Sequence, residues 1–137
     1  MKKILMICAV VFGFAFTASS VMAQDNEKAE FKFNEEKHDF GKVPQGTPVT
    51  TVFTFTNIGH EPLILTDVRP TCGCTIADYT KTPVKANDAG FIKITYNAAY
   101  AAPFTKTIVV TSNSKTPVKN LIIVGEVVAK PVTTGSK

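Results

Sequence analysis

From Phe31 to Val128 the chain is divided into short segments in which apolar and polar residues alternate. In 49–57, Phe53 and Phe55 fall on one side and threonines on the other, which is the period of a half-buried strand. Turn-forming Pro, Gly, Asn and Asp residues separate the segments. Because no longer stretch after residue 23 shows a helical period with caps, we expect this part of the chain to fold as strands.

We predict strands in seven such segments, the first of them an edge strand in two pieces with a bend between them. The predicted ranges are 31–33 with 37–43, then 49–57, 63–68, 75–79, 91–97, 104–112 and 118–128. This spacing predicts an all-β fold, a seven-stranded immunoglobulin-like β-sandwich over residues 31–129. The chain has no tryptophan, so the Cys…Trp…Cys pattern of antibody domains is absent, and burial of Phe, Ile, Val and Leu must hold the sheets together.

Residues 1–23 have the pattern of a secretory signal peptide. Lys2 and Lys3 form a positive start, 4–16 is apolar, and Val21-Met22-Ala23 supplies a cleavage pattern of small residues. The apolar run is shorter than the roughly 20 residues that span a bilayer. We therefore expect cleavage, no transmembrane segment afterwards, and an exported protein that is periplasmic or extracellular.

The polar ends of the remaining chain are predicted to lie outside the domain, residues 24–30 as a disordered leader and 130–137 as a polar tail. The formal net charge of +4 falls to +2 once Lys2 and Lys3 are removed, and no run of Lys and Arg exceeds two residues. A nucleic-acid partner is not expected from this charge pattern.

Two cysteines remain after removal of the export signal, and they lie one residue apart in Thr71-Cys72-Gly73-Cys74-Thr75. In an extended strand their Cα atoms would be roughly 6.6 Å apart, at the long end of the range that a disulfide allows. Gly73 permits the bend that would bring them closer. We expect a disulfide or thiol pair at Cys72 and Cys74, with Gly73 and Thr75 completing the motif.

The same two thiols allow other chemistry. They could bind copper, or they could supply half of a zinc site whose remaining ligands would be His38, His60 or carboxylates. They could exchange disulfides, although thiol redox enzymes more often place Cys-x-x-Cys at a helix start, or they could cross-link two chains. Serines and carboxylates elsewhere form no spacing typical of a catalytic site. We therefore predict that the protein is not an enzyme and has no resident cofactor, with copper or zinc at Cys72 and Cys74 as the alternative.

Several motifs together carry a resemblance to a known family. They are Phe53-Thr-Phe55-Thr-Asn57-Ile-Gly59, Pro62-Leu63-Ile-Leu, Cys72-Gly73-Cys74-Thr75 and Ile108-Val-Val-Thr-Ser112-Asn113, with Gly125 near the end. The chain resembles a bacterial family of secreted domains of unknown function, DUF1573, which is similar to Hydin and major-sperm-protein immunoglobulin-like domains. The resemblance implies a seven-stranded sandwich, export and no established catalytic residues. The expected function is an exported, non-enzymatic module that binds a protein or cell-envelope component; the alternative is a soft-metal or thiol redox protein acting through Cys72 and Cys74.

Overall fold

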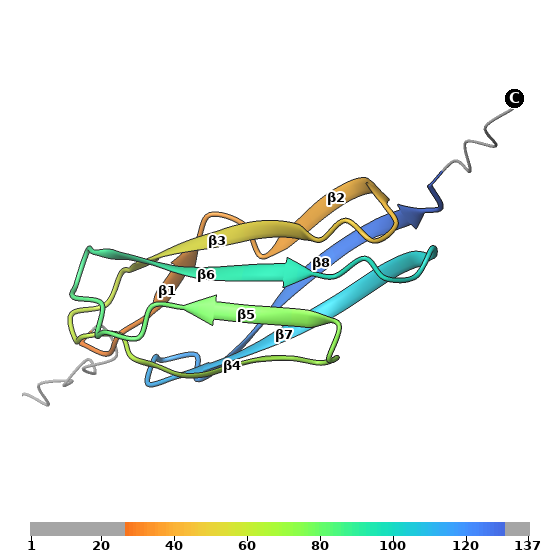
Figure 1. The fold of residues 1–137 in the computed structure, drawn as a ribbon. Helices are drawn as coiled ribbons and strands as arrows, with labels where there is room; N and C mark the ends of the chain where they lie inside the picture. The colour runs from red at the N-terminus through yellow and green to blue at the C-terminus, as the bar shows by residue number, and fades with distance from the viewer. Residues whose placement is uncertain (1–26, 131–137) are drawn as a thin grey trace, which may run out of the picture.

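The computed structural model describes residues 27–130, which form two four-stranded β-sheets stacked face to face (Figure 1). The strands are β1 (Phe31–Phe33), β2 (Lys37–Pro44), β3 (Val49–Asn57), β4 (Leu65–Pro70), β5 (Thr75–Tyr79), β6 (Ala89–Tyr96), β7 (Pro103–Ser112) and β8 (Val118–Val128). The predicted export signal and residues 131–137 of the predicted tail lie outside the described residues. The all-β sandwich predicted from the sequence is confirmed.

Residues 27–130 form eight strands, and the predicted count of seven is wrong. The first sheet has the order β1-β3-β6-β5 and the second the order β2-β8-β7-β4. The two pieces predicted as one edge strand therefore lie at the edges of opposite sheets. β1 pairs antiparallel with β3, whereas β2 pairs parallel with β8. The turn between β1 and β2 thus carries the chain from one sheet to the other.

The core lies between the two inward faces. Phe53 and Phe55 of β3 are buried, as the alternating pattern predicts, and Gly90 of β6 lies against the Phe55 ring, where an added Cβ would collide with ring atoms. The second sheet contributes aliphatic side chains from β7 and β8. The largest fully buried apolar side chains are Phe53, Phe55, Leu63, Ile92, Ile94, Ile108, Leu121, Ile123, Val43 and Val110. This largely apolar interior holds the sheets together by burial of apolar surface.

The segment before β1 is ordered and packed against the sandwich. Ala29 is fully buried. The Glu61 N–H donates to Glu27 O at 2.8 Å, and the Ile58 N–H donates to Glu30 O at 2.9 Å. The prediction of a disordered leader is therefore wrong for residues 27–30, because their backbone hydrogen bonds satisfy the turn after β3; residues 24–26 lie outside the described range.

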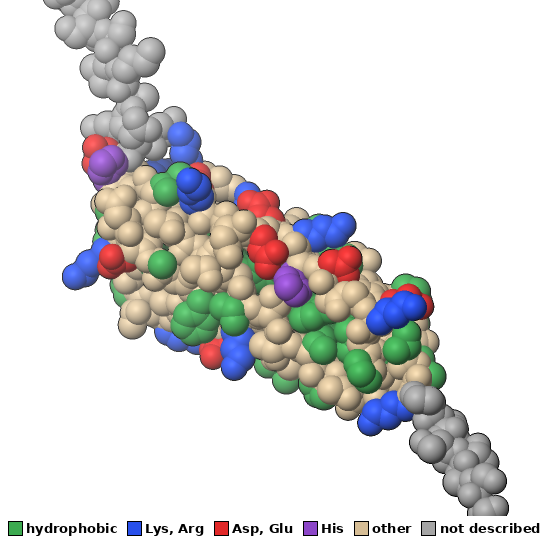
Figure 2. All heavy atoms as spheres, turned by 90° about the horizontal axis from the view of Figure 1, so that it is seen from above, with side chains coloured by type: hydrophobic (Ala, Val, Ile, Leu, Met, Phe, Trp, Pro, Cys, Tyr) green, Lys and Arg blue, Asp and Glu red, His purple; other side chains and the backbone are tan. Residues whose placement is uncertain are grey.

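The surface carries charges of both signs. On the face shown in Figure 2, Lys and Arg side chains are interspersed with Asp and Glu, and hydrophobic side chains form separate groups between them. Residues 27–130 include no helix with the length and apolarity needed to cross a membrane.

Candidate functional site

The cysteine motif forms the turn that leads from β4, at the edge of the second sheet, to β5, at the edge of the first. Backbone hydrogen bonds hold this turn at both ends. The Thr71 N–H donates to Thr107 O on β7, and the Asn97 N–H after β6 donates to Cys74 O, both at 3.0 Å. The turn is therefore anchored to both sheets of the sandwich.

The turn brings the two cysteines together. Their Cα atoms are 5.4 Å apart and their sulfur atoms lie at disulfide distance. Both side chains are half-buried, and Cys74 packs against the core. Gly73 is exposed, its φ lies outside the left-handed region, and an added Cβ would meet nothing within 4 Å. The bend that we predicted is present, but it does not depend on angles that only glycine adopts.

Thr75 is the fourth member of the motif, and it is buried. Its Oγ1 lies 3.7 Å from Cys72 Sγ and 3.9 Å from Cys74 Sγ. A sulfur in a disulfide has no proton to give, so the Thr75 hydroxyl is the donor, and its single proton can be directed to either sulfur. The sequence named Thr75 only as part of the motif, and the structure adds that its hydroxyl reaches both sulfurs.

The two histidines lie elsewhere. His38 is on β2, where its Nδ1 lies 3.0 Å from Glu35 Oε1, and His60 is exposed in the turn after β3. Within residues 27–130 no three His, Cys, Asp or Glu side chains form a group that could hold a metal ion. A zinc site completed by these histidines is not assembled in this part of the chain, whereas copper or zinc binding by the cysteine pair itself stays a prediction.

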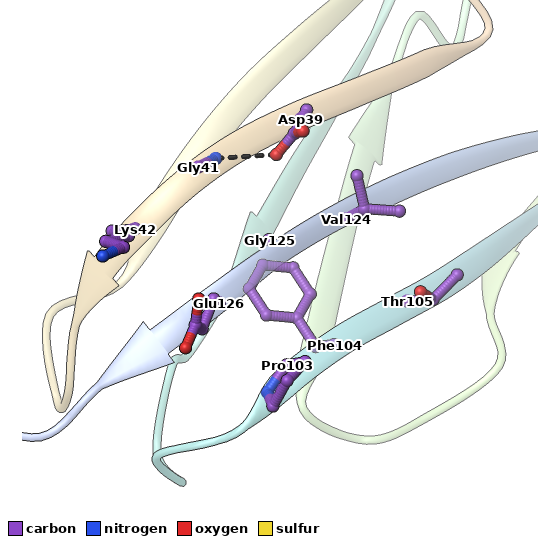
Figure 3. Close-up of a pocket in the computed structure, with 9 residues that line it drawn as sticks. All are labelled: Asp39, Gly41, Lys42, Pro103, Phe104, Thr105, Val124, Gly125 and Glu126. Carbon is purple, nitrogen blue, oxygen red and sulfur yellow. Dashed lines mark hydrogen bonds between the residues drawn. The ribbon is translucent and has the colours of Figure 1, made fainter.

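An open pocket of about 390 Å³ lies where β2 bulges away from β8 (Figure 3). Its floor includes Gly125 and the Phe104 ring, which fills the space that a side chain at Gly125 would need. Its rim carries Asp39, Lys42 and Glu126, and Asp39 Oδ1 accepts the Gly41 N–H at 2.8 Å. The pocket residues are Asp39, Gly41, Lys42, Pro103, Phe104, Thr105, Val124, Gly125 and Glu126. The cysteine turn contributes none of them.

Asn57, at the end of β3, is a fully buried polar residue whose role sequence reasoning missed. Its Oδ1 accepts the N–H groups of Glu30 and Gly59, at 3.2 and 3.0 Å. Its Nδ2 donates to Glu61 O at 2.7 Å and to Val84 O at 3.0 Å. The sequence signal was that Asn57 is a polar residue at a position that the alternation places on the same inward face as Phe53 and Phe55. Asn57 is thus a structural residue that ties three loops together.

Comparison with solved structures supports the fold. A protein of unknown function from Porphyromonas gingivalis matches with a TM-score of 0.66 and 16% identity, over 77% of this chain and 50% of that one. The human CEP192 ASH/PapD-like domain 7 matches with a TM-score of 0.58 and 11% identity, over 79% of this chain and 90% of that one. The secreted serine protease VesC from Vibrio cholerae matches with a TM-score of 0.54 and 16% identity, over 75% of this chain and 24% of that one.

This chain thus spans half of the Porphyromonas protein and 24% of VesC. At such identities the likeness shows the fold alone, an immunoglobulin-like sandwich of the PapD-like kind. The search of curated proteins found no match. A family model does match, over residues 31–127, and the chain belongs to the family that it describes, the protein of unknown function DUF1573.

Proposed function

We propose that this protein is an exported, non-enzymatic immunoglobulin-like module that binds another protein of the cell envelope along the open edge of β5. The observation that carries the proposal is this edge. Among residues 27–130, β5 pairs with β6 on one side and has no strand on the other, and Ile76 is 70% exposed. Unpaired strand edges are sites where an extended segment of another protein adds to a sheet.

The backbone of β5 has free hydrogen-bonding groups at this edge. Cys74 O accepts the N–H of Asn97, which follows β6, and the Thr80 N–H donates to Phe91 O on β6. In an antiparallel pair, residues of the same parity direct their backbone groups toward the neighbouring strand. Ala77 and Tyr79 therefore direct their backbone groups outward. The Tyr79 N–H donates to Asp78 Oδ1 at 2.9 Å, so the Ala77 N–H and C=O and the Tyr79 C=O are the groups with which a partner strand could pair.

The other three edges are protected against strand addition. β1 has only three residues. β2 has a register shift around Gly41, whose φ is 67°. β4 ends in Pro70 and also has a register shift. Short strands, bulges and proline each oppose pairing at an edge, which leaves β5 as the edge best suited to it.

The side chains on the outer face of β5 define the partner. Ile76 and Asp78 are exposed on this face, two residues apart. An incoming strand would place its own side chains beside them, since cross-strand neighbours on one face lie in contact. The partner that fits is an extended segment with an apolar residue for Ile76 and a lysine or arginine for Asp78.

The test uses a photoreactive amino acid at position 76 in cells that produce the full chain, with Val118, 55% exposed, as the matched control position. We expect a protein cross-link from position 76 only. Ala77→Pro, which removes one outward N–H, should abolish it, whereas Ala77→Thr should retain it. Equal cross-linking from both positions, or a cross-link unaffected by Ala77→Pro in a folded variant, would contradict the proposal.

A further inference from the structure

The position of the Thr75 hydroxyl points to chemistry that a binding role along β5 does not require. The hydroxyl is buried and lies within hydrogen-bonding reach of both sulfurs, at 3.7 Å from Cys72 and 3.9 Å from Cys74. Hydrogen bonds to a charged group are stronger than those to a neutral one. This contact therefore becomes stronger when one of the sulfurs becomes a thiolate.

We infer that the Cys72–Cys74 pair is a disulfide that oxidises cysteine thiols by exchange, with Thr75 as the positioning residue that stabilises the departing thiolate. Exchange depends on how well the leaving sulfur bears negative charge. In redox proteins with Cys-x-x-Cys, a helix N-terminus supplies this stabilisation. The described part of this chain has no helix, and the Thr75 hydroxyl supplies a donor in the corresponding place.

The two sulfurs are not equivalent. Cys74 packs against the core, whereas Cys72 is not among the side chains that do so. An incoming thiolate attacks Cys72 Sγ, a new S–S bond forms with the substrate, and the Cys72–Cys74 bond breaks. The electron pair leaves on Cys74 Sγ, which accepts the Thr75 O–H and later takes up a proton from water.

A second substrate thiolate completes the reaction. It attacks the substrate sulfur of the mixed disulfide and releases Cys72 as a thiolate, which Thr75 Oγ1 also reaches. Two substrate thiols are thereby oxidised to a disulfide, and Cys72 and Cys74 are reduced by the same two electrons. Only one residue separates the cysteines, so opening their bond releases little chain entropy and leaves the fold in place.

The test measures how fast excess glutathione opens the disulfide in the full chain at fixed pH, with acid quenching and mass spectrometry. We expect Thr75→Val, which keeps the shape and removes the donor, to slow opening about tenfold, the effect of a hydrogen bond to a charged group. Thr75→Ser should restore the rate. Opening of Thr75→Val at the wild-type rate, or no opening of the wild-type disulfide, would overturn the inference.

Two single-cysteine variants give an independent measurement if Thr75→Val does not fold. With oxidised glutathione, Cys74→Ser should form the mixed disulfide at Cys72 faster than Cys72→Ser forms it at Cys74. Equal rates, or the reverse order, would overturn the assigned direction of attack. The rate of disulfide opening is also measured with a reduced two-cysteine peptide in place of glutathione. Comparing the two rates distinguishes polypeptide thiols from small thiols as the substrate. None of these readouts depends on a partner at the β5 edge, so the binding proposal and this inference can fail separately.

Discussion

Removing the Asn57 side chain tests the structural account most directly. The side chain makes four hydrogen bonds to backbone groups of three loops, and it is fully buried. Each such bond contributes about 0.5 to 1.5 kcal/mol net, so Asn57→Ala should lower the free energy of unfolding by about 2 to 6 kcal/mol. Small domains are stable by only about 5 to 15 kcal/mol, so this loss would be large.

Urea unfolding followed by circular dichroism measures the difference. The matched control is Asn34→Ala, because Asn34 is exposed and its Oδ1 accepts a single N–H, from Thr54; it should cost less than about 1 kcal/mol. Asn57→Leu keeps the branched shape and the number of heavy atoms and removes all four bonds, so it should be as unstable as Asn57→Ala. A stable Asn57→Leu protein would refute the reasoning, since filling space rather than hydrogen bonding would then be what Asn57 contributes.

Four further outcomes are expected from the same structure. Gly59→Ala should lower stability by at least about 2 kcal/mol in urea unfolding, because its Cβ would overlap the Lys28 carbonyl oxygen. Gly73→Ala should change stability by less than about 1 kcal/mol and leave the disulfide intact. Replacing Cys72 and Cys74 together by serine should cost no more than about 2 kcal/mol and leave the circular dichroism spectrum unchanged. Intact mass before and after alkylation should show cleavage after residue 23 and no free thiol; an uncleaved or fully alkylated protein would contradict it.

The parts of the fold that could be predicted are those encoded by local alternation. In β3 and β6 the inward residues are those that a period of two selects, since one face of each strand packs on the core. The partition of β1 and β2 between two sheets could not be predicted in this way. It depends on pairing with strands far along the chain, β3 for one and β8 for the other. Local pattern shows a bend between these pieces and carries no information on which partner each chooses.

The site divides in the same way. The cysteine pair and its bend follow from residue spacing, because the reach of a disulfide is fixed by covalent geometry. The contact of Thr75 with both sulfurs depends on how the turn is held between β6 and β7, which spacing does not give. Asn57 shows the same limit, since its four partners come from segments that only the folded chain brings together.

Asn57 and the cysteine turn lie near different ends of β6, so the residue that stabilises the loops is distant from the site of thiol exchange. Thr56, next to Asn57, pairs with Ala89 at the start of β6, whereas Thr75 pairs with Tyr96 at its end. The asparagine that ties the loops and the cysteine turn therefore lie at opposite ends of the first sheet (Figure 1). Sites that share no contacts contribute to stability almost independently. Substitutions in the cysteine turn should therefore change thiol exchange without changing the fold, and substitutions around Asn57 should lower stability without changing the order in which the two sulfurs react.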